Sequence, residues 1–139
     1  MAWRSVGAVT AAVLLAGCQS SSWQHILGPR QSAAELRSYQ TRAFDTTDRL
    51  KTLRTVIATL QDLGFVIDKA DAALGVVTAT KLDGYQLRLT VTVRERGSAQ
   101  LMVRANAQYE GMAVESPEPY QQFFEALRKA MFLTAHQVD

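Results

Sequence analysis

The residue with the most distinctive chemistry in this sequence is Cys18, the only cysteine. It ends the tetrapeptide Leu-Ala-Gly-Cys at residues 15–18, where the small side chains of Ala16 and Gly17 let an extended backbone enter a narrow processing site. Its sulfur is the group there that is suited to forming a thioether. The alternative is a buried thiol in an N-terminal helix, which would leave the preceding apolar segment without a compact domain around it. Without a second cysteine, a disulfide within one chain is excluded.

The residues before Cys18 have the layout of a secretory leader. Arg4 supplies an early positive charge, and residues 5–15 are apolar or small but too few to span a bilayer comfortably. Together with this leader, residues 15–18 resemble the lipobox of bacterial lipoproteins. The resemblance implies that residues 1–17 are a signal peptide and that Cys18 is lipidated and becomes the first mature residue. Its acyl chains would then anchor the protein to a membrane.

The polar segment at residues 18–38 is predicted to be a tether. In enteric-type bacteria, an aspartate directly after the lipidated cysteine resembles an inner-membrane retention signal. Gln19 occupies that position here and lacks the charge. This favours the outer membrane, with the protein facing the periplasm. Trp23, Ile26 and Leu27 are the apolar exceptions in this tether. They either fold back on the domain or contact a partner or the lipid headgroups.

The remaining side chains do not indicate catalytic or metal-binding chemistry. The two histidines, His25 and His136, lie in the tether and near the last residue, so no base is paired with a nucleophile. No metal-ligand spacing and no glycine-rich phosphate loop is present. Asp68, Asp71 and Asp83 lie at predicted turns, where aspartate is common for backbone reasons. The sequence therefore predicts a protein that is not an enzyme and has no cofactor or metal.

The charge of the chain is nearly balanced. There are 15 Lys and Arg residues against 13 Asp and Glu residues, which gives a formal net charge of +2. Removing residues 1–17 takes away Arg4 and no acidic residue, so the mature chain would carry about +1. Such a small excess gives little support to nucleic-acid binding.

Two groups of residues could form a binding surface. Arg88, Arg94 and Arg104 lie on the predicted polar face of a sheet, where they could hydrogen-bond anionic or carbohydrate groups. The alternative is a solvated sheet face. Met112 and Val114 lie in an apolar loop, which either contacts a partner or folds over the end of the core.

Periodicity predicts the first half of the folded part. A short helix at residues 32–37 lies within the tether, a strand at 39–44 follows, and a helix at 47–63 ends at Gly64. The residues that could cap the start of the second helix are Asp45, Thr46 and Thr47, and those of its buried stripe are Leu50, Leu53, Ile57 and Leu60.

The second half reads as strands joined by turns. Strands are predicted at residues 65–68 and 76–80, with a hairpin signal at 83–84. Strict apolar–polar alternation follows in 85–94 and 101–109, as in an antiparallel sheet with one covered face. The residues expected on the covered face are Tyr85, Leu87, Leu89, Val91, Val93, Leu101, Val103, Ala105, Ala107 and Tyr109.

A last helix is predicted from about residue 117 to 136, because Pro117 and Pro119 suit a first turn and a wide apolar stripe follows. The predicted fold of residues 39–139 is a two-layer α+β sandwich in the order β-α-β-β-β-β-α, an antiparallel sheet with two helices on one face. The residues of the stripe are Tyr120, Phe123, Phe124, Leu127, Ala130 and Met131.

The element order over residues 39–135 resembles a helix-grip domain of the C-type lipoprotein of the outer-membrane β-barrel assembly machinery. The segments that carry the resemblance are residues 41–44, 60–65 and 65–81. That lipoprotein has two such domains and this sequence has one, and no functional residue is carried over. Our hypothesis is an outer-membrane lipoprotein that serves as a non-catalytic, protein-binding accessory subunit of an envelope complex. The alternative is a periplasmic lipoprotein that binds a small ligand between sheet and helices.

Overall fold

The computed structural model describes residues 32–82 and 86–135. The predicted signal peptide, Cys18, most of the tether, the turn at residues 83–84 and His136 lie outside the described residues. In chain order the elements are α2 (Ala33–Gln40), β1 (Thr41–Phe44), α3 (Arg49–Asp62), β2 (Val66–Asp71), β3 (Val76–Leu82), β4 (Gln86–Arg96), β5 (Gln100–Tyr109), β6 (Met112–Ala113) and α4 (Glu118–Ala135). No helix within these two ranges is long and apolar enough to cross a membrane.

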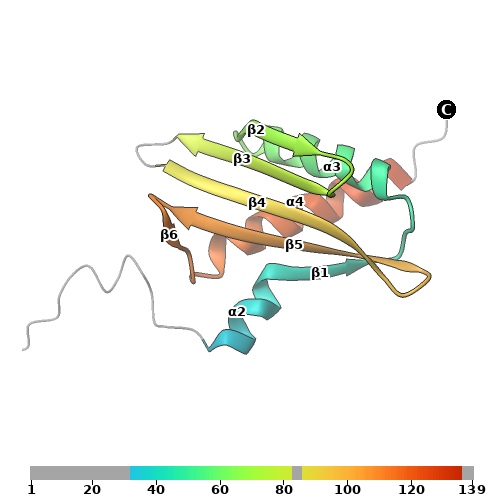
Figure 1. Cartoon of the computed structure of the whole chain (residues 1–139), viewed down its shortest axis with the longest axis horizontal. Coiled ribbons are helices and arrows are strands. Elements are labelled where there is room, and N and C mark those ends of the chain that lie inside the picture. The colour runs from blue at the N-terminus through green and yellow to red at the C-terminus, as the bar shows by residue number, and fades with distance from the viewer. Residues whose placement is uncertain (1–31, 83–85, 136–139) are drawn as a thin grey trace, which may run out of the picture.

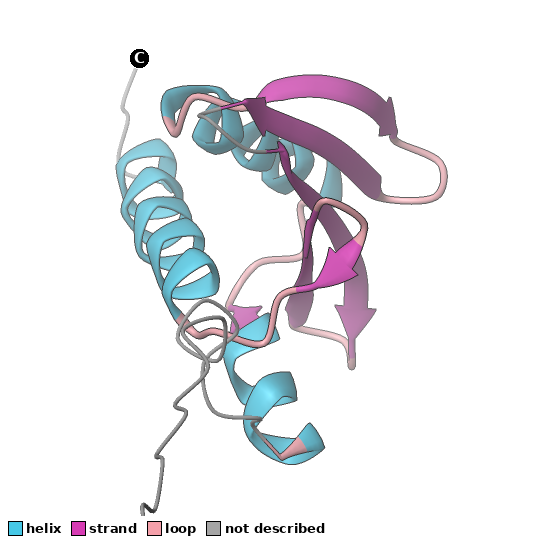
Figure 2. Ribbon diagram, turned by 90° about the vertical axis from the view of Figure 1, so that its left-hand side faces the viewer, coloured by secondary structure: helices cyan, strands magenta, loops and turns pink. Residues whose placement is uncertain are grey.

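The strands form one antiparallel sheet, and α3 and α4 cover one of its faces (Figures 1 and 2). The strand order is β1-β5-β4-β3-β2, and the short strand β6 also pairs with β5. The predicted two-layer α+β sandwich with helices on one face is therefore confirmed. The short helix predicted at residues 32–37 is present as α2, and the structure adds one element, β6, within the segment that was predicted to be a loop.

Strands β4 and β5 follow the predicted alternation. Their inward side chains are almost completely buried, whereas Arg88, Arg104 and Gln108 are exposed on the other face. Because every second side chain changes face, a single register serves the core along both strands. The buried residues are Leu87, Leu89, Val91 and Val93 in β4 and Leu101, Val103, Ala105 and Ala107 in β5.

Helix α4 supplies the largest buried side chains. Tyr120, Phe123, Phe124 and Leu127 are at most 4% exposed, as the stripe predicted. The rings of Phe123 and Phe124 meet edge to face, with centroids 5.1 Å apart, which is a favourable arrangement for aromatic pairs.

The predicted buried stripe of α3 is wrong at Leu50, which is 50% exposed. The inward face is rotated, and it contains Thr52, Thr55 and Thr59 beside the apolar residues. Each of these threonine hydroxyls donates to the carbonyl four residues earlier, at 2.8–2.9 Å. The polar atom is thus satisfied and the methyl group can pack inside, which a count of apolar residues alone misses.

The start of α3 also differs from the prediction. Asp48 is the N-cap residue, and its carboxylate accepts from the Lys51 amide at 3.0 Å. Thr46 instead accepts from the Asp48 amide, and Asp45 accepts from the side chain of Gln100. The predicted end is confirmed, because Gly64 follows the helix with a φ of +87°.

Helix α2 occupies part of the segment that was predicted to be tether. Ser32 and Glu35 form a capping box at its start, and Leu36 and Tyr39 pack against the core. The helix runs directly into β1, so the strand begins at Thr41 rather than at Tyr39. The packed part of the chain thus begins before the predicted boundary.

Candidate functional site

The three arginines singled out in the sequence all lie on the open face of the sheet. Arg94 is paired with Met102 and Arg104 with Thr92, so these two arginines are diagonal neighbours on adjacent strands, about 7–8 Å apart. Arg88 lies six residues before Arg94 on the same strand, about 20 Å away. The structure therefore brings two of the three together and places the third at the other end of the face.

Met112 and Val114 have different environments. Met112, in β6, is 54% exposed. Val114 packs against the core, its amide donates to the carbonyl of Ala107 at 2.9 Å, and its carbonyl accepts from the hydroxyl of Tyr120. Of the two, Val114 therefore folds over the end of the core, and Met112 is the one that presents an apolar side chain to solvent.

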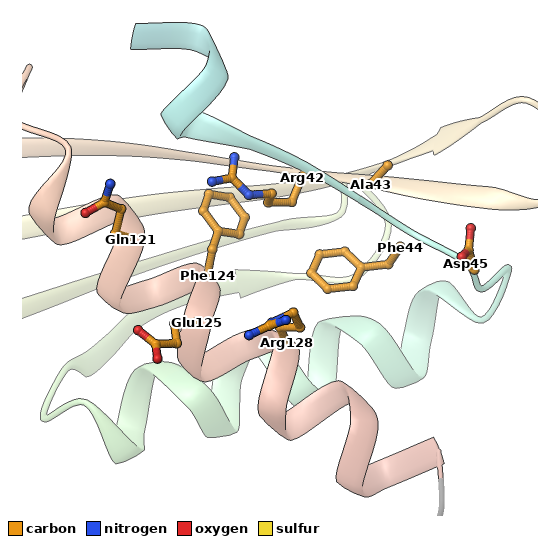
Figure 3. Close-up of a pocket in the computed structure, with 8 residues that line it drawn as sticks. All are labelled: Arg42, Ala43, Phe44, Asp45, Gln121, Phe124, Glu125 and Arg128. Atoms are coloured by element: carbon orange, nitrogen blue, oxygen red, sulfur yellow. The ribbon is translucent and has the colours of Figure 1, made fainter. Parts of the chain in front are cut away.

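A groove that the sequence did not reveal lies between β1 and α4 (Figure 3). It is open to solvent and has a volume of about 560 Å³. One wall is the edge strand and the other is a single stripe of the helix. The lining residues are Arg42, Ala43, Phe44 and Asp45 from β1 and the following turn, and Gln121, Phe124, Glu125 and Arg128 from α4.

Strand pairing directs the two β1 side chains that shape this groove. Arg42 is opposite Val103 and Phe44 is opposite Leu101. Both partners are buried under the helices, and residues directly opposite each other in a sheet point to the same side. Arg42 and Phe44 therefore point toward α4, as Figure 3 shows.

The end of the groove next to α2 is held in place by Arg42. Its guanidinium lies over the ring of Phe124, 5.2 Å from the centroid, and donates to the carbonyls of Ser38 and Thr41. A cation over an aromatic face is attractive, and the two carbonyls fix its orientation. At the other end, the Gln100 side chain donates to Asp45 at 2.6 Å. At both ends of the groove, a charged side chain is therefore already held in place by hydrogen bonds.

The middle of the groove combines apolar and charged groups. Phe124 is 4% exposed and forms the floor, and Phe44 is half-buried beside it. Glu125 and Arg128 stand exposed on the rim, and their side chains make no hydrogen bond or ion pair with other residues of 32–82 and 86–135. These two charges are available to an incoming molecule.

This arrangement suits binding. The described residues contain no group of His, Cys, Asp and Glu side chains that could hold a metal ion. A smaller cavity of about 210 Å³ lies where α4 begins, beside Phe65 and Lys81. It is below the range of about 300–1,000 Å³ that is usual for small-molecule sites, whereas the β1–α4 groove falls within it.

The sequence matches no protein-family model and no curated protein. Function is therefore inferred from the residues of the groove and from the leader.

Proposed function

We propose that this protein is a lipid-anchored, non-enzymatic subunit of a bacterial envelope complex that holds a partner protein in the β1–α4 groove. The tetrapeptide at residues 15–18 and the leader before it support an anchor at Cys18 in the outer membrane. The observation that carries protein binding is the position of the groove, which runs along a strand that has one neighbour in the sheet.

An edge strand favours an extended polypeptide as the occupant. β1 is paired with β5 along one side, and the groove lies between β1 and α4. Free backbone donors and acceptors on such an edge can pair with an added strand, while side chains of that strand enter neighbouring pockets. The four residues of β1 would match an extended segment of similar length, about 13 Å.

The side chains of the groove suit a short protein segment with a central apolar residue. Phe44 and Phe124 provide the apolar contact, and the exposed rim residues Glu125 and Arg128 can pair with charges on either side of it. Aromatic and arginine side chains around a desolvated centre are typical of the residues that dominate protein interfaces.

The alternative is that a small ligand occupies the same groove, whose volume of about 560 Å³ is sufficient. Native mass spectrometry of the protein purified from its host distinguishes the two. A bound mass of a few hundred daltons would favour the ligand.

Site-specific photo-crosslinking in living cells tests the protein-binding proposal. A photoreactive amino acid replaces Gln121 or Glu125, which are exposed on α4 and line the groove, and Gln108 on the open face is the matched control. We expect one envelope protein to be crosslinked from both groove positions and not from the control, and the reversed charge in Arg128→Glu to weaken it. Absence of such a protein, or equal crosslinking from Gln108, would refute the proposal.

The anchor is tested separately with Cys18→Ser. We expect this variant to incorporate no labelled palmitate and to accumulate as an unprocessed precursor. Normal maturation and retention at the outer membrane would contradict the proposed anchor.

A further inference from the structure

The open face of β4 and β5 carries charge of one sign. From Gln86 to Arg94 and from Met102 to Gln108, the charged side chains that point to this face are Arg88, Arg94 and Arg104, and no acidic side chain points there. The side chains between them are mostly threonines and amides, which can hydrogen-bond but do not neutralise charge. This face is therefore basic even though the chain as a whole is nearly neutral.

The guanidinium groups on this face are largely unused. The guanidinium groups of Arg88 and Arg94 donate no hydrogen bond to the residues of 32–82 and 86–135, and that of Arg104 makes one long contact to the Thr41 hydroxyl, at 3.4 Å. Two acidic residues of the neighbouring strand β2, Asp68 and Asp71, lie beside this face, and neither forms an ion pair with these arginines. Asp68 accepts from the Thr80 hydroxyl at 2.6 Å, and Asp71 accepts from the Leu74 amide at 2.9 Å.

Two exposed aliphatic residues lie at one end of the same face. Val66 is opposite Thr80, which is in turn opposite Arg88, and Leu82 is opposite Gln86 in the next row. Val66 is 70% exposed and Leu82 is 79% exposed. Aliphatic tips beside arginine are the combination that suits the boundary between lipid headgroups and acyl chains.

We infer that this open face binds the anionic headgroups of the membrane that carries the anchor. The inference rests on the proposed anchor, because residues 18–31 would hold the domain within about 46 Å of the bilayer. A tether of that reach keeps the local concentration of headgroups at the domain high. A broad sheet face whose arginines form no ion pair with the described residues matches a surface of many phosphates.

This orientation is compatible with the groove. Arg42 and Phe44 point to the helix side of the sheet, away from the open face. The domain can therefore lie with its open face on the membrane while the groove holds a partner.

The test uses the mature chain from Gln19 made without acyl chains, mixed with vesicles of equal parts phosphatidylcholine and phosphatidylglycerol or of phosphatidylcholine alone. The first variant combines Arg88→Gln, Arg94→Gln and Arg104→Gln. The matched control removes the same charge from the helices with Arg37→Gln, Arg54→Gln and Lys129→Gln, all at exposed positions. All proteins share residues 19–31, so any affinity of that segment cancels in the comparison.

We expect the unaltered chain to sediment with the anionic vesicles and not with the neutral ones, and added salt to release it. The open-face variant should lose at least about ten-fold in partitioning, since each arginine near an anionic surface contributes about five-fold. The helix variant should lose less than about three-fold. Equal losses in the two variants, or no binding of the unaltered chain to anionic vesicles, would overturn the inference.

Two further measurements check that the open-face variant is folded and test the role of the aliphatic end of the face. Unaltered thermal unfolding of the open-face variant shows that it is folded, and Leu82→Gln, which leaves every charge in place, should also weaken vesicle binding. Unchanged partitioning in Leu82→Gln would refute the role of the aliphatic end. The vesicle assay needs neither lipidation nor a protein partner, so its failure is distinct from failure of the crosslinking or palmitate experiments.

Discussion

The covered and the open faces of β4 and β5 are made from alternating residues of the same two strands, yet they have opposite character. On the covered face, Leu89, Val91 and Val103 are at most 1% exposed. On the open face, Arg88 and Arg104 are exposed to solvent. Packing therefore determines which residues one face can contain, while the other face is free to be used for binding.

This difference means that stability and function should separate at adjacent positions. A change on the covered face removes buried contacts or creates a cavity, whereas a change on the open face alters charge or hydrogen bonding without disturbing the core. Pairs of substitutions at neighbouring residues of one strand test this directly, because both share the same backbone environment.

The largest effect is expected for Leu89→Ala in comparison with Arg88→Ala. Leu89 is 1% exposed, so truncation leaves a cavity and should lower the free energy of unfolding by about 2–5 kcal/mol. Arg88→Ala should change it by less than about 1 kcal/mol, the span of strand propensities. Urea denaturation followed by circular dichroism measures both. Comparable losses in the two variants would mean that the open face also contributes to stability.

An intermediate effect is expected for Tyr120→Phe, which tests how the covered face accommodates a polar group. Tyr120 is fully buried, and its hydroxyl accepts from the Ala107 amide at 3.2 Å and donates to the carbonyl of Val114. It thereby joins the edge of β5 to the chain after β6. Removing the hydroxyl leaves two buried backbone groups without this partner and should cost about 1–3 kcal/mol.

Tyr39→Phe is the control for this substitution. Tyr39 is half-buried, and its hydroxyl makes no hydrogen bond within the described part of the chain, so a change below about 0.5 kcal/mol is expected. An unchanged urea midpoint in Tyr120→Phe would show that the hydroxyl is not needed at this edge.

The same comparison explains which features could be predicted from the sequence. The alternation in β4 and β5 extends over many residues, so local pattern alone assigned the described side chains of both strands to their faces, whereas Tyr85 lies outside the described residues. In α3 the pattern misled at Leu50, because threonines that bond to their own helix backbone took buried positions that a hydrophobic count gives to leucine.

The groove could not be predicted for a different reason. β1 has four residues, and its partner Arg104 lies 63 residues beyond Thr41. Nothing in such a short segment specifies a distant partner, so neither the exposed edge nor its approach to α4 was visible. By contrast, the arginines were assigned to one face by alternation, and only the hairpin register was needed to show that Arg94 and Arg104 are neighbours.

The smallest effect is expected for Thr90→Val, which replaces a side chain on the open face by one of the same shape. Thr90 is half-buried between Thr78 and Asn106, and its hydroxyl bonds to no residue of 32–82 or 86–135. Exchange for valine should alter the free energy of unfolding by at most about 0.5 kcal/mol.

Val91→Thr is the reciprocal exchange at the next residue, which is fully buried, and it should cost about 1–3 kcal/mol because the new hydroxyl lacks a partner. One variant replaces a hydroxyl by a methyl group and the other replaces a methyl group by a hydroxyl. Differences in side-chain volume and strand propensity therefore nearly cancel when the two are compared. Equal effects on the urea midpoint would therefore show that the faces differ less in hydration than their burial indicates.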